Sequence, residues 1–271
     1  MSEPIRLVAL DLDGTLLNEE LHITPRTINA IRDATTAGVH VTLATGRGFV
    51  STRPFAERLG ITTPLICYQG GVIGDPCTGR VLHEVTMSAE IAERVIEQAD
   101  REDLDISLYG EDVIYFRKLL WPQEFYERWF GLRIVHEPRL RRILDYAQPL
   151  KFIIIAEPAE ADVIEMRWKR LFDGPLHIVR SHRLFVEGNP PGASKGTALA
   201  WLAARLGVPR ESVMAVGDND NDRSMVEWAG VGVAMGSGAA SLQSVADWVA
   251  PGQAEDGAAI ALERFALGRH A

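Results

Sequence analysis

Residues 8–17, VALDLDGTLL, join an apolar run to two carboxylates and carry the clearest indication of the fold. Residues 5–10, which are apolar except for Arg6, predict a buried strand. Asp11 and Asp13 follow at alternate positions, and side chains two apart on extended backbone point to the same side. Two carboxylates in one small volume repel each other, so this pair predicts a bound cation, a shared proton or a basic partner.

The first third of the chain alternates strand-like and helical patterns around this stretch. Thr24 is typical of a helix N-cap, and Gly38 is typical of the residue that ends the helix. A second strand is expected over residues 39–44, a helix over 49–59 and a third strand over 64–68. Strands that alternate with helices are typical of βαβ units, so the predicted fold class is α/β with a parallel sheet.

The pattern changes after residue 70. Residues 70–85, GGVIGDPCTGRVLHEV, predict a β-hairpin with its turn around Asp75 and Gly79. Two helices and short paired strands follow, which predicts an inserted α+β unit of roughly 100 residues. The expected elements are helices over 88–99 and 159–172 and strands over 106–108, 113–116, 151–156, 176–179 and 184–186.

The parallel pattern resumes after the insert. A helix is expected over residues 197–206, and the expected strands are 213–216, 231–235 and 248–249. Within the insert, the stretch WPQEFYERWF has Trp121, Phe125, Trp129 and Phe130 near helical spacing, and it predicts core packing rather than a stacking platform.

Composition limits the classes of partner. The chain has 271 residues, and at roughly 100 to 200 residues per domain this predicts one large domain or two smaller ones. The formal net charge is −9 and no basic run occurs, which argues against nucleic acid or an anionic membrane as the main partner. The start carries no pattern of a signal peptide, so we expect a cytoplasmic protein with Cys67 and Cys77 as free thiols.

Polar side chains follow the predicted strands or begin the predicted helices at four places. Because ligands of open α/β sheets bind outside the carboxyl ends of the strands, these places are expected to converge. Carboxylate oxygens with no histidine or thiolate nearby favour Mg²⁺ over zinc or copper. The four groups are Asp11 with Asp13, Thr45 with Gly46 and Arg47, Lys195, and Asp218 with Asn221 and Asp222.

Each group also has a simpler explanation. An Asp-x-Asp pair can be a turn, and Thr45 to Arg47 can be a plain strand-to-helix turn, with Arg47 in a salt bridge. GDNDND can be a surface loop, although it lacks the glycine and the distal glutamate of an EF-hand loop. Lys195 can be a solvated residue at a helix start, but it is the only lysine outside the insert, which gives it more weight.

DLDGT, ATGR, the lysine of GASKG, and GDNDND occur in this order, and in this order they resemble the haloacid dehalogenase (HAD) superfamily. The large insert between the second and third motifs resembles Cof-type phosphatases with a C2 cap, as does the closing stretch DWVAPGQAEDGAAIALERF. The resemblance implies a Rossmann-like HAD core of residues 1–83 and 188–271, with a C2-type α+β cap of residues 84–187 between them.

The resemblance also implies roles. Asp11 would be the nucleophile that accepts the phosphoryl group, and Asp13 would be the general acid and base. Thr45, Gly46 and Lys195 would bind the phosphoryl oxygens. The implied Mg²⁺ ligands are Asp11, the backbone carbonyl of Asp13, and Asp218, with Asn221 and Asp222 nearby as ligands or as residues that orient them.

The implied function is a Mg²⁺-dependent phosphatase, a phosphoric monoester hydrolase, acting on a small sugar phosphate-like metabolite through an aspartyl-phosphate. The alternatives are a phosphomutase with the same intermediate and a non-catalytic sensor of a phosphorylated ligand. Arg47, Gln69 and Gly70 are expected to contact the substrate. Gln69 departs from the asparagine that relatives often carry, and Asp220 adds a carboxylate where many carry a small or neutral residue.

Overall fold

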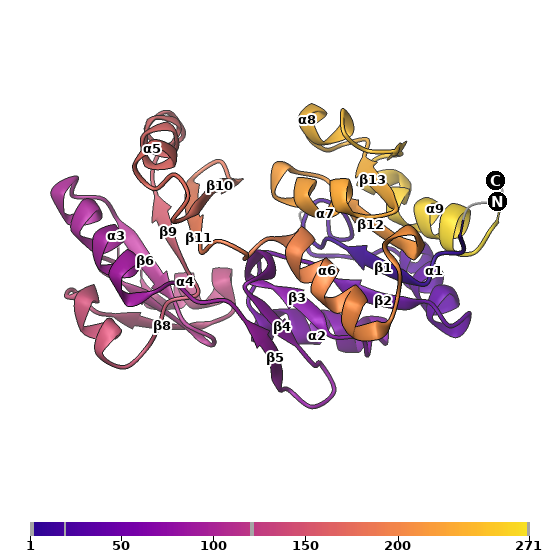
Figure 1. Cartoon of the computed structure of the whole chain (residues 1–271), viewed down its shortest axis with the longest axis horizontal. Coiled ribbons are helices and arrows are strands. Elements are labelled where there is room, and N and C mark those ends of the chain that lie inside the picture. The colour runs from indigo at the N-terminus through magenta and orange to yellow at the C-terminus, as the bar shows by residue number, and fades with distance from the viewer. Residues whose placement is uncertain (1–2, 19, 120–121, 270–271) are drawn as a thin grey trace.

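The computed structural model describes residues 3–18, 20–119 and 122–269, without the side chains of residues 128, 129, 181 and 182. One half of the molecule contains a sheet of five parallel strands in the order β14-β13-β12-β1-β2 (Figure 1). Its strands are β1 (Leu7–Leu10), β2 (His40–Leu43), β12 (Val213–Gly217), β13 (Val231–Met235) and β14 (Trp248–Ala250).

A sixth strand extends this sheet. A parallel bridge between Ala44 and Ile66 brings β3 (Leu65–Cys67) beside β2. If only these six parallel strands are numbered in chain order, they lie side by side in the order 3-2-1-4-5-6. This is the strand order of the Rossmann fold. The predicted α/β class with a parallel sheet is confirmed. The predicted hairpin is confirmed too, because β4 (Val72–Gly74) and β5 (Val81–Glu84) pair antiparallel.

Helices cover both faces of the parallel sheet. Val8 and Leu10 of β1 belong to a cluster with buried residues of helices on one side, and Leu7 and Ala9 belong to a cluster on the other. The first group of helices is α1 (Pro25–Thr36), α2 (Phe49–Leu59) and α9 (Gly257–Ala261). The second is α6 (Lys195–Leu206), α7 (Arg223–Trp228) and α8 (Ala240–Gln243). Burial on both faces explains why these strands are almost continuously apolar.

The insert forms a six-stranded sheet in the order β10-β11-β9-β6-β7-β8. Its strands are β6 (Ile106–Tyr109), β7 (Val113–Phe116), β8 (Arg133–His136), β9 (Lys151–Ile155), β10 (His177–His182) and β11 (Phe185–Asn189). Helices α3 (Ala89–Arg101) and α5 (Pro158–Leu171) pack on its outer face, away from the parallel sheet (Figure 1). The inner face, with Tyr109 and Ile153, joins the cluster that contains Leu10 of β1. The inner face is therefore turned toward the parallel-sheet half.

Two details of the insert differ from the sequence analysis. Strand β8 was not predicted; it pairs parallel with β7 at the sheet edge. In α4 (Gln123–Phe130), Tyr126 is buried, but Phe125 is 45% exposed, so the prediction of core packing is wrong for Phe125. Trp121 and the side chain of Trp129 lie outside the described residues. The division at residue 188 stays a prediction, and β11 continues past it to Asn189.

Both cysteines are free, as expected, with Cys67 buried and Cys77 exposed. Within the described ranges, no helix combines the length and the apolar character that crossing a bilayer requires.

Asp105, just before β6, is expected to make the stability of the insert depend on pH. Neither carboxylate oxygen has a hydrogen-bond partner within the described part of the chain, and burial raises the pKa of Asp105 to about 6. A carboxyl whose pKa is higher in the folded state stabilises the fold when protonated, so this contribution is lost as pH rises through about 6.

We expect Asp105→Asn to stabilise the protein by about 1 kcal/mol near pH 7.5, because asparagine carries no charge that burial would disfavour. This value is smaller than the full pKa shift implies, since the side chain is partly exposed and solvent screens its charge. Urea unfolding midpoints of both proteins measure the effect. The gain should shrink near pH 4.5, and an equal gain at both pH values would contradict this account.

Candidate active site

The first and fourth core strands, β1 and β12, are neighbours, and the chain leaves them in opposite directions across the sheet. This reversal of strand order is the place where open α/β sheets bind ligands. Asp11 directly follows β1, and Asp218 directly follows β12. The backbone N–H of Asp11 donates to the carbonyl of Val216 at 3.0 Å, which holds the two strand ends side by side. The two aspartates from opposite ends of the chain therefore meet at the switch point.

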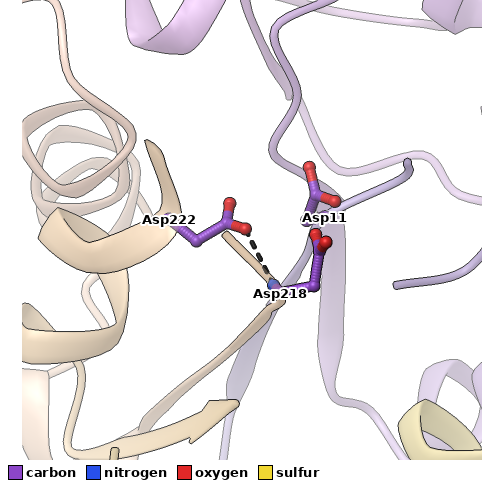
Figure 2. A group of neighbouring side chains, drawn as sticks. All are labelled: Asp11, Asp218 and Asp222. Atoms are coloured by element: carbon purple, nitrogen blue, oxygen red, sulfur yellow. Dashed lines mark hydrogen bonds between the residues drawn. The ribbon is translucent and has the colours of Figure 1, made fainter. Parts of the chain in front are cut away.

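Three carboxylates gather there. Asp11, Asp218 and Asp222 each offer an oxygen, and these oxygens lie within 4.8 Å of one another (Figure 2). Burial raises the pKa of Asp11 well above its usual value, and the charges of Asp222 and Asp218 add to this. Burial, followed by the charge of Asp222, raises the pKa of Asp218 to about 6. The cluster therefore favours a cation or protons as partners.

Lys195 supplies one positive charge to this cluster. It is the first residue of α6, its side chain is 0% exposed, and its Nζ lies 2.6 Å from Asp11 Oδ1 and 2.5 Å from Asp222 Oδ1. Burial alone would lower the pKa of Lys195, but the two carboxylates outweigh it and raise the pKa above its usual value. The alternative of a solvated helix-start lysine is therefore wrong. The phosphoryl contact implied for Lys195 stays a prediction.

Asp222 orients the loop that carries Asp218. Its Oδ2 accepts hydrogen bonds from the backbone N–H groups of Asp218, at 2.9 Å, and Asn219, at 3.1 Å (Figure 2 draws the first of them). Its Oδ1 is held by Lys195. Since both oxygens already have partners, this geometry favours Asp222 as a residue that orients the others over Asp222 as a direct metal ligand.

The residues at the switch point fit a hard divalent cation. Asp11 and Asp218 bring carboxylate oxygens of the kind that Mg²⁺ prefers, and neither aspartate lies on an exposed surface. Gly14 has φ +89°, and a Cβ there would lie 2.4 Å from Asp218 Oδ2. Only glycine therefore lets the loop after Asp13 approach Asp218 so closely. Thr15 Oγ1 donates to Asp218 Oδ1 at 3.4 Å and helps to set its direction.

Asp13 and Arg47 form a two-pronged ion pair. Arg47 Nε lies 2.8 Å from Asp13 Oδ2, and Arg47 Nη2 lies 2.6 Å from Asp13 Oδ1. The hydrogen bond to Asp13 raises the pKa of Arg47 above its usual value. Thr45 is buried, and its Oγ1 accepts the backbone N–H of Arg47 at 3.1 Å, which fixes the turn. The salt bridge proposed as the simpler explanation of Arg47 is present, and its partner is Asp13.

Gln69 and Asn221 connect two loops of the site. Asn221 Nδ2 donates to Gln69 Oε1 at 3.2 Å, and Gln69 has φ +58°. The amide of Gln69 also lies against Gly46, where a Cβ would come within 2.7 Å of Gln69 Nε2. Gly70 has φ +96° and packs against Ser194, whose carbonyl oxygen would lie 2.2 Å from an added Cβ. The longer amide of Gln69 therefore spans from the second motif to the fourth.

A cavity of about 310 Å³ opens over these residues, between the parallel sheet and the inner face of the insert. Most of the predicted site residues line it: Asp11, Asp13, Thr45, Gly46, Arg47, Gln69, Asp218 and Asn221. The cavity is not lined by Gly70, Lys195 or Asp222. These residues lie behind its wall, where Lys195 contacts Asp222 and Gly70 packs against Ser194. The four sequence motifs therefore do converge on one site.

Comparison with known proteins identifies the family. The family model that describes haloacid dehalogenase-like hydrolases matches residues 8–262, which include all four motifs. The chain belongs to the haloacid dehalogenase-like hydrolase family. The predicted superfamily is confirmed.

Relatives in the HAD family are similar over nearly the whole chain. Phosphatase YwpJ of Bacillus subtilis is 31% identical, covering 94% of this chain and 98% of its own. The 5-amino-6-(5-phospho-D-ribitylamino)uracil phosphatase YcsE of Bacillus subtilis is 32% identical, covering 97% and 96%. A solved haloacid dehalogenase-like hydrolase from B. subtilis superposes with a TM-score of 0.85 at 29% identity, covering 96% of this chain and 99% of the other.

The cavity of this HAD-family protein also contains residues that the sequence analysis missed. Tyr109, Lys151 and Glu187 line it from the inserted sheet, together with Phe130 and Phe185. For Lys151 and Glu187 the available signal was a charged residue next to apolar strand residues, in KFIII and FVEGN. Such a residue is rarely buried without a partner or a function.

Proposed function

We propose that the protein is a Mg²⁺-dependent phosphatase that hydrolyses a small phosphorylated metabolite through an aspartyl-phosphate on Asp11. One observation carries this proposal: the Asp11 carboxylate lies at the switch point, with Lys195 on one oxygen and Asp218 beside it, at the wall of the cavity. The names of the relatives YwpJ and YcsE, both phosphatases, support it.

Each residue of the site has a separate role in the proposed reaction. Lys195 holds Asp11 Oδ1, which leaves Oδ2 to form the bond to phosphorus as the bond from phosphorus to the alcohol oxygen breaks. To act as the general acid, Asp13 leaves its ion pair with Arg47 and takes up a proton, which it gives to the leaving oxygen. It then takes a proton from the water that attacks phosphorus and frees Asp11. Thr45 Oγ1 and the backbone N–H of Gly46 donate to the phosphoryl oxygens, while the Arg47 N–H holds Thr45 Oγ1 in place. Mg²⁺ held by Asp11, the Asp13 carbonyl and Asp218 would neutralise charge on the transferring group.

The inserted sheet would serve as the cap that covers the site. Its inner face closes the cavity and keeps bulk water away from the phosphorylated aspartate. A volume of about 310 Å³ suits a small metabolite. The relative YcsE is named for a substrate with a phosphorylated ribityl chain, which is consistent with a small phosphorylated metabolite here.

Removal of Mg²⁺ tests this proposal. We expect a chelator to reduce hydrolysis of p-nitrophenyl phosphate to background, and added Mg²⁺ to restore it. Because protons compete for Asp218, whose pKa is raised to about 6, the Mg²⁺ concentration for half-maximal rate should rise as pH falls through that value. Full activity of chelated, metal-free protein would contradict the proposal.

A further inference from the structure

The inner face of the inserted sheet places three polar side chains together over the cavity. Tyr109 of β6 lies directly opposite Lys151 of β9 in the antiparallel register, so both point to the same face. Ile153 shares that face with Lys151, and Glu187 of β11 lies opposite Ile153. Tyr109, Lys151 and Glu187, which we call the cap-face triad, therefore form one polar patch, and all three line the cavity.

The charged pair of the triad is deeply buried. Lys151 Nζ lies 2.7 Å from Glu187 Oε2, and the two side chains are 3% and 4% exposed. Lys151 Nζ also lies 4.9 Å from the centre of the Tyr109 ring. Replacing a buried ion pair by apolar residues of similar size is often neutral or stabilising. Stability alone therefore gives little reason for this pair at the wall of a cavity.

The hydroxyl of Tyr109 lacks a hydrogen-bond partner in the described part of the chain. Tyr109 is 3% exposed, and its hydroxyl makes no hydrogen bond to any residue that the structure describes. Burial, with the charge of Glu187 adding to it, raises the pKa of Tyr109 well above its usual value, so the hydroxyl stays a neutral donor. A buried hydroxyl without a partner is destabilising. Its partner is expected to arrive with a ligand that enters the cavity.

A purely structural role for the pair is the competing explanation. Lys151 Nζ lies 3.5 Å from the carbonyl oxygen of Gly46, so the pair also links the insert to the second motif. That contact does not involve the Tyr109 hydroxyl. Tyr109 therefore separates the two explanations.

We propose that the cap-face triad binds hydroxyl groups of the leaving alcohol, and that the substrate is a phosphorylated polyol or sugar without a second phosphate. The proposal rests on the proposed phosphatase function. Lys151 donates, Glu187 accepts and Tyr109 does either, which matches neighbouring hydroxyl groups that also donate and accept. Lys151 and Glu187 together carry no net charge, so the pair offers a second phosphate no net electrostatic attraction. Phe130 and Phe185 line the same cavity and offer apolar contact to the C–H faces of such a molecule.

The test compares three kinds of substrate in the wild type and in matched variants. The wild type is assayed with a panel of sugar and polyol monophosphates, with sugar bisphosphates, and with p-nitrophenyl phosphate, whose leaving group has no second hydroxyl. We expect the best substrate to be a monophosphate of the panel. In Tyr109→Phe, its kcat/KM relative to that of p-nitrophenyl phosphate should fall about 10-fold, mainly through a higher KM.

Tyr115→Phe is the matched control. Tyr115 lies on the same sheet but packs in the cluster on the outer face, so its variant should keep the wild-type ratio. The double variant Lys151→Met/Glu187→Leu removes both charges together and should lower the ratio at least as far as Tyr109→Phe. Tyr109→Phe should melt at or above the wild-type temperature, because it removes an unpaired hydroxyl.

Other results would overturn the inference. The proposed role of the cap-face triad is refuted if Tyr109→Phe leaves the kcat/KM ratio unchanged, or if a bisphosphate is the best substrate. In either case, turnover of p-nitrophenyl phosphate would still support the phosphatase proposal. A wild type that hydrolyses no phosphate ester with Mg²⁺ refutes both.

Discussion

Replacing Asp11 by asparagine is expected to reduce phosphatase turnover by about 10⁴-fold or more, because the amide oxygen carries no charge and is a poor nucleophile toward phosphorus. No described residue is placed to take over this step. Asp218 and Asp222 are the carboxylates grouped with Asp11, but Asp218 is assigned to Mg²⁺ in the proposal, and Asp222 has both oxygens in hydrogen bonds. The measurement is kcat for p-nitrophenyl phosphate with saturating Mg²⁺.

The fold should survive this substitution. Burial disfavours the charged form of Asp11 and raises its pKa, and Lys195 keeps a second carboxylate partner in Asp222, so a neutral amide of the same shape should cost little stability. The expected melting temperature therefore lies close to that of the wild type, and the loss of rate can be assigned to chemistry.

Asp220→Asn gives a matched control for Asp11→Asn. Asp220 belongs to the same acidic loop as Asp218, yet its carboxylate is exposed, accepts a hydrogen bond from Ser241 Oγ at 2.6 Å and does not line the cavity. Its variant should keep near wild-type kcat. If Asp11→Asn stayed within tenfold of the wild type while Asp220→Asn did not, Asp11 would not be the nucleophile.

The convergence of the motifs could be predicted because it depends on local features. Asp11 and Asp218 each follow a short apolar strand, and in a parallel sheet the carboxyl ends of all strands lie along one edge. A motif of a few residues directly after a strand is therefore enough to predict that its side chains lie in the ligand-binding crevice at that edge. The same local logic predicted helices over residues 49–59 and 197–206, and Gly60 and Gly207, which follow them directly, adopt the left-handed conformation of a helix end.

The inner wall of the cavity depends on information that no short motif contains. Whether Lys151 and Glu187 meet depends on how β9 pairs with β11, and a shift by one residue would turn either side chain to the outer face. The partner of Arg47 likewise depends on a loop conformation 34 residues away, at Asp13. Pairings of this kind follow from three-dimensional register, so the sequence analysis identified Arg47 but not its partner, and it missed the cap-face triad.

Replacing Lys195 by methionine is expected to destabilise the protein by about 3–5 kcal/mol, because it leaves two buried carboxylates without their cation. Lys195 is fully buried between Asp11 and Asp222, and neither aspartate has another lysine or arginine among its ion pairs in the described part of the chain. Hydrolysis of p-nitrophenyl phosphate should also fall to near background, since Asp11 would lose the residue that holds its Oδ1. Urea unfolding followed by circular dichroism measures the stability.

The electrostatic origin of this loss can be separated from the loss of packing. Asp11 has a raised pKa, so lowering the pH neutralises it and should make the stability deficit of Lys195→Met smaller near pH 5 than near pH 8. The double variant Lys195→Met/Asp222→Asn removes one of the stranded charges and should recover part of the deficit, a positive coupling that a double-mutant cycle quantifies. A deficit that is independent of pH and unaffected by Asp222→Asn would show that Lys195 acts by filling space, and that the acidic cluster is balanced by another cation.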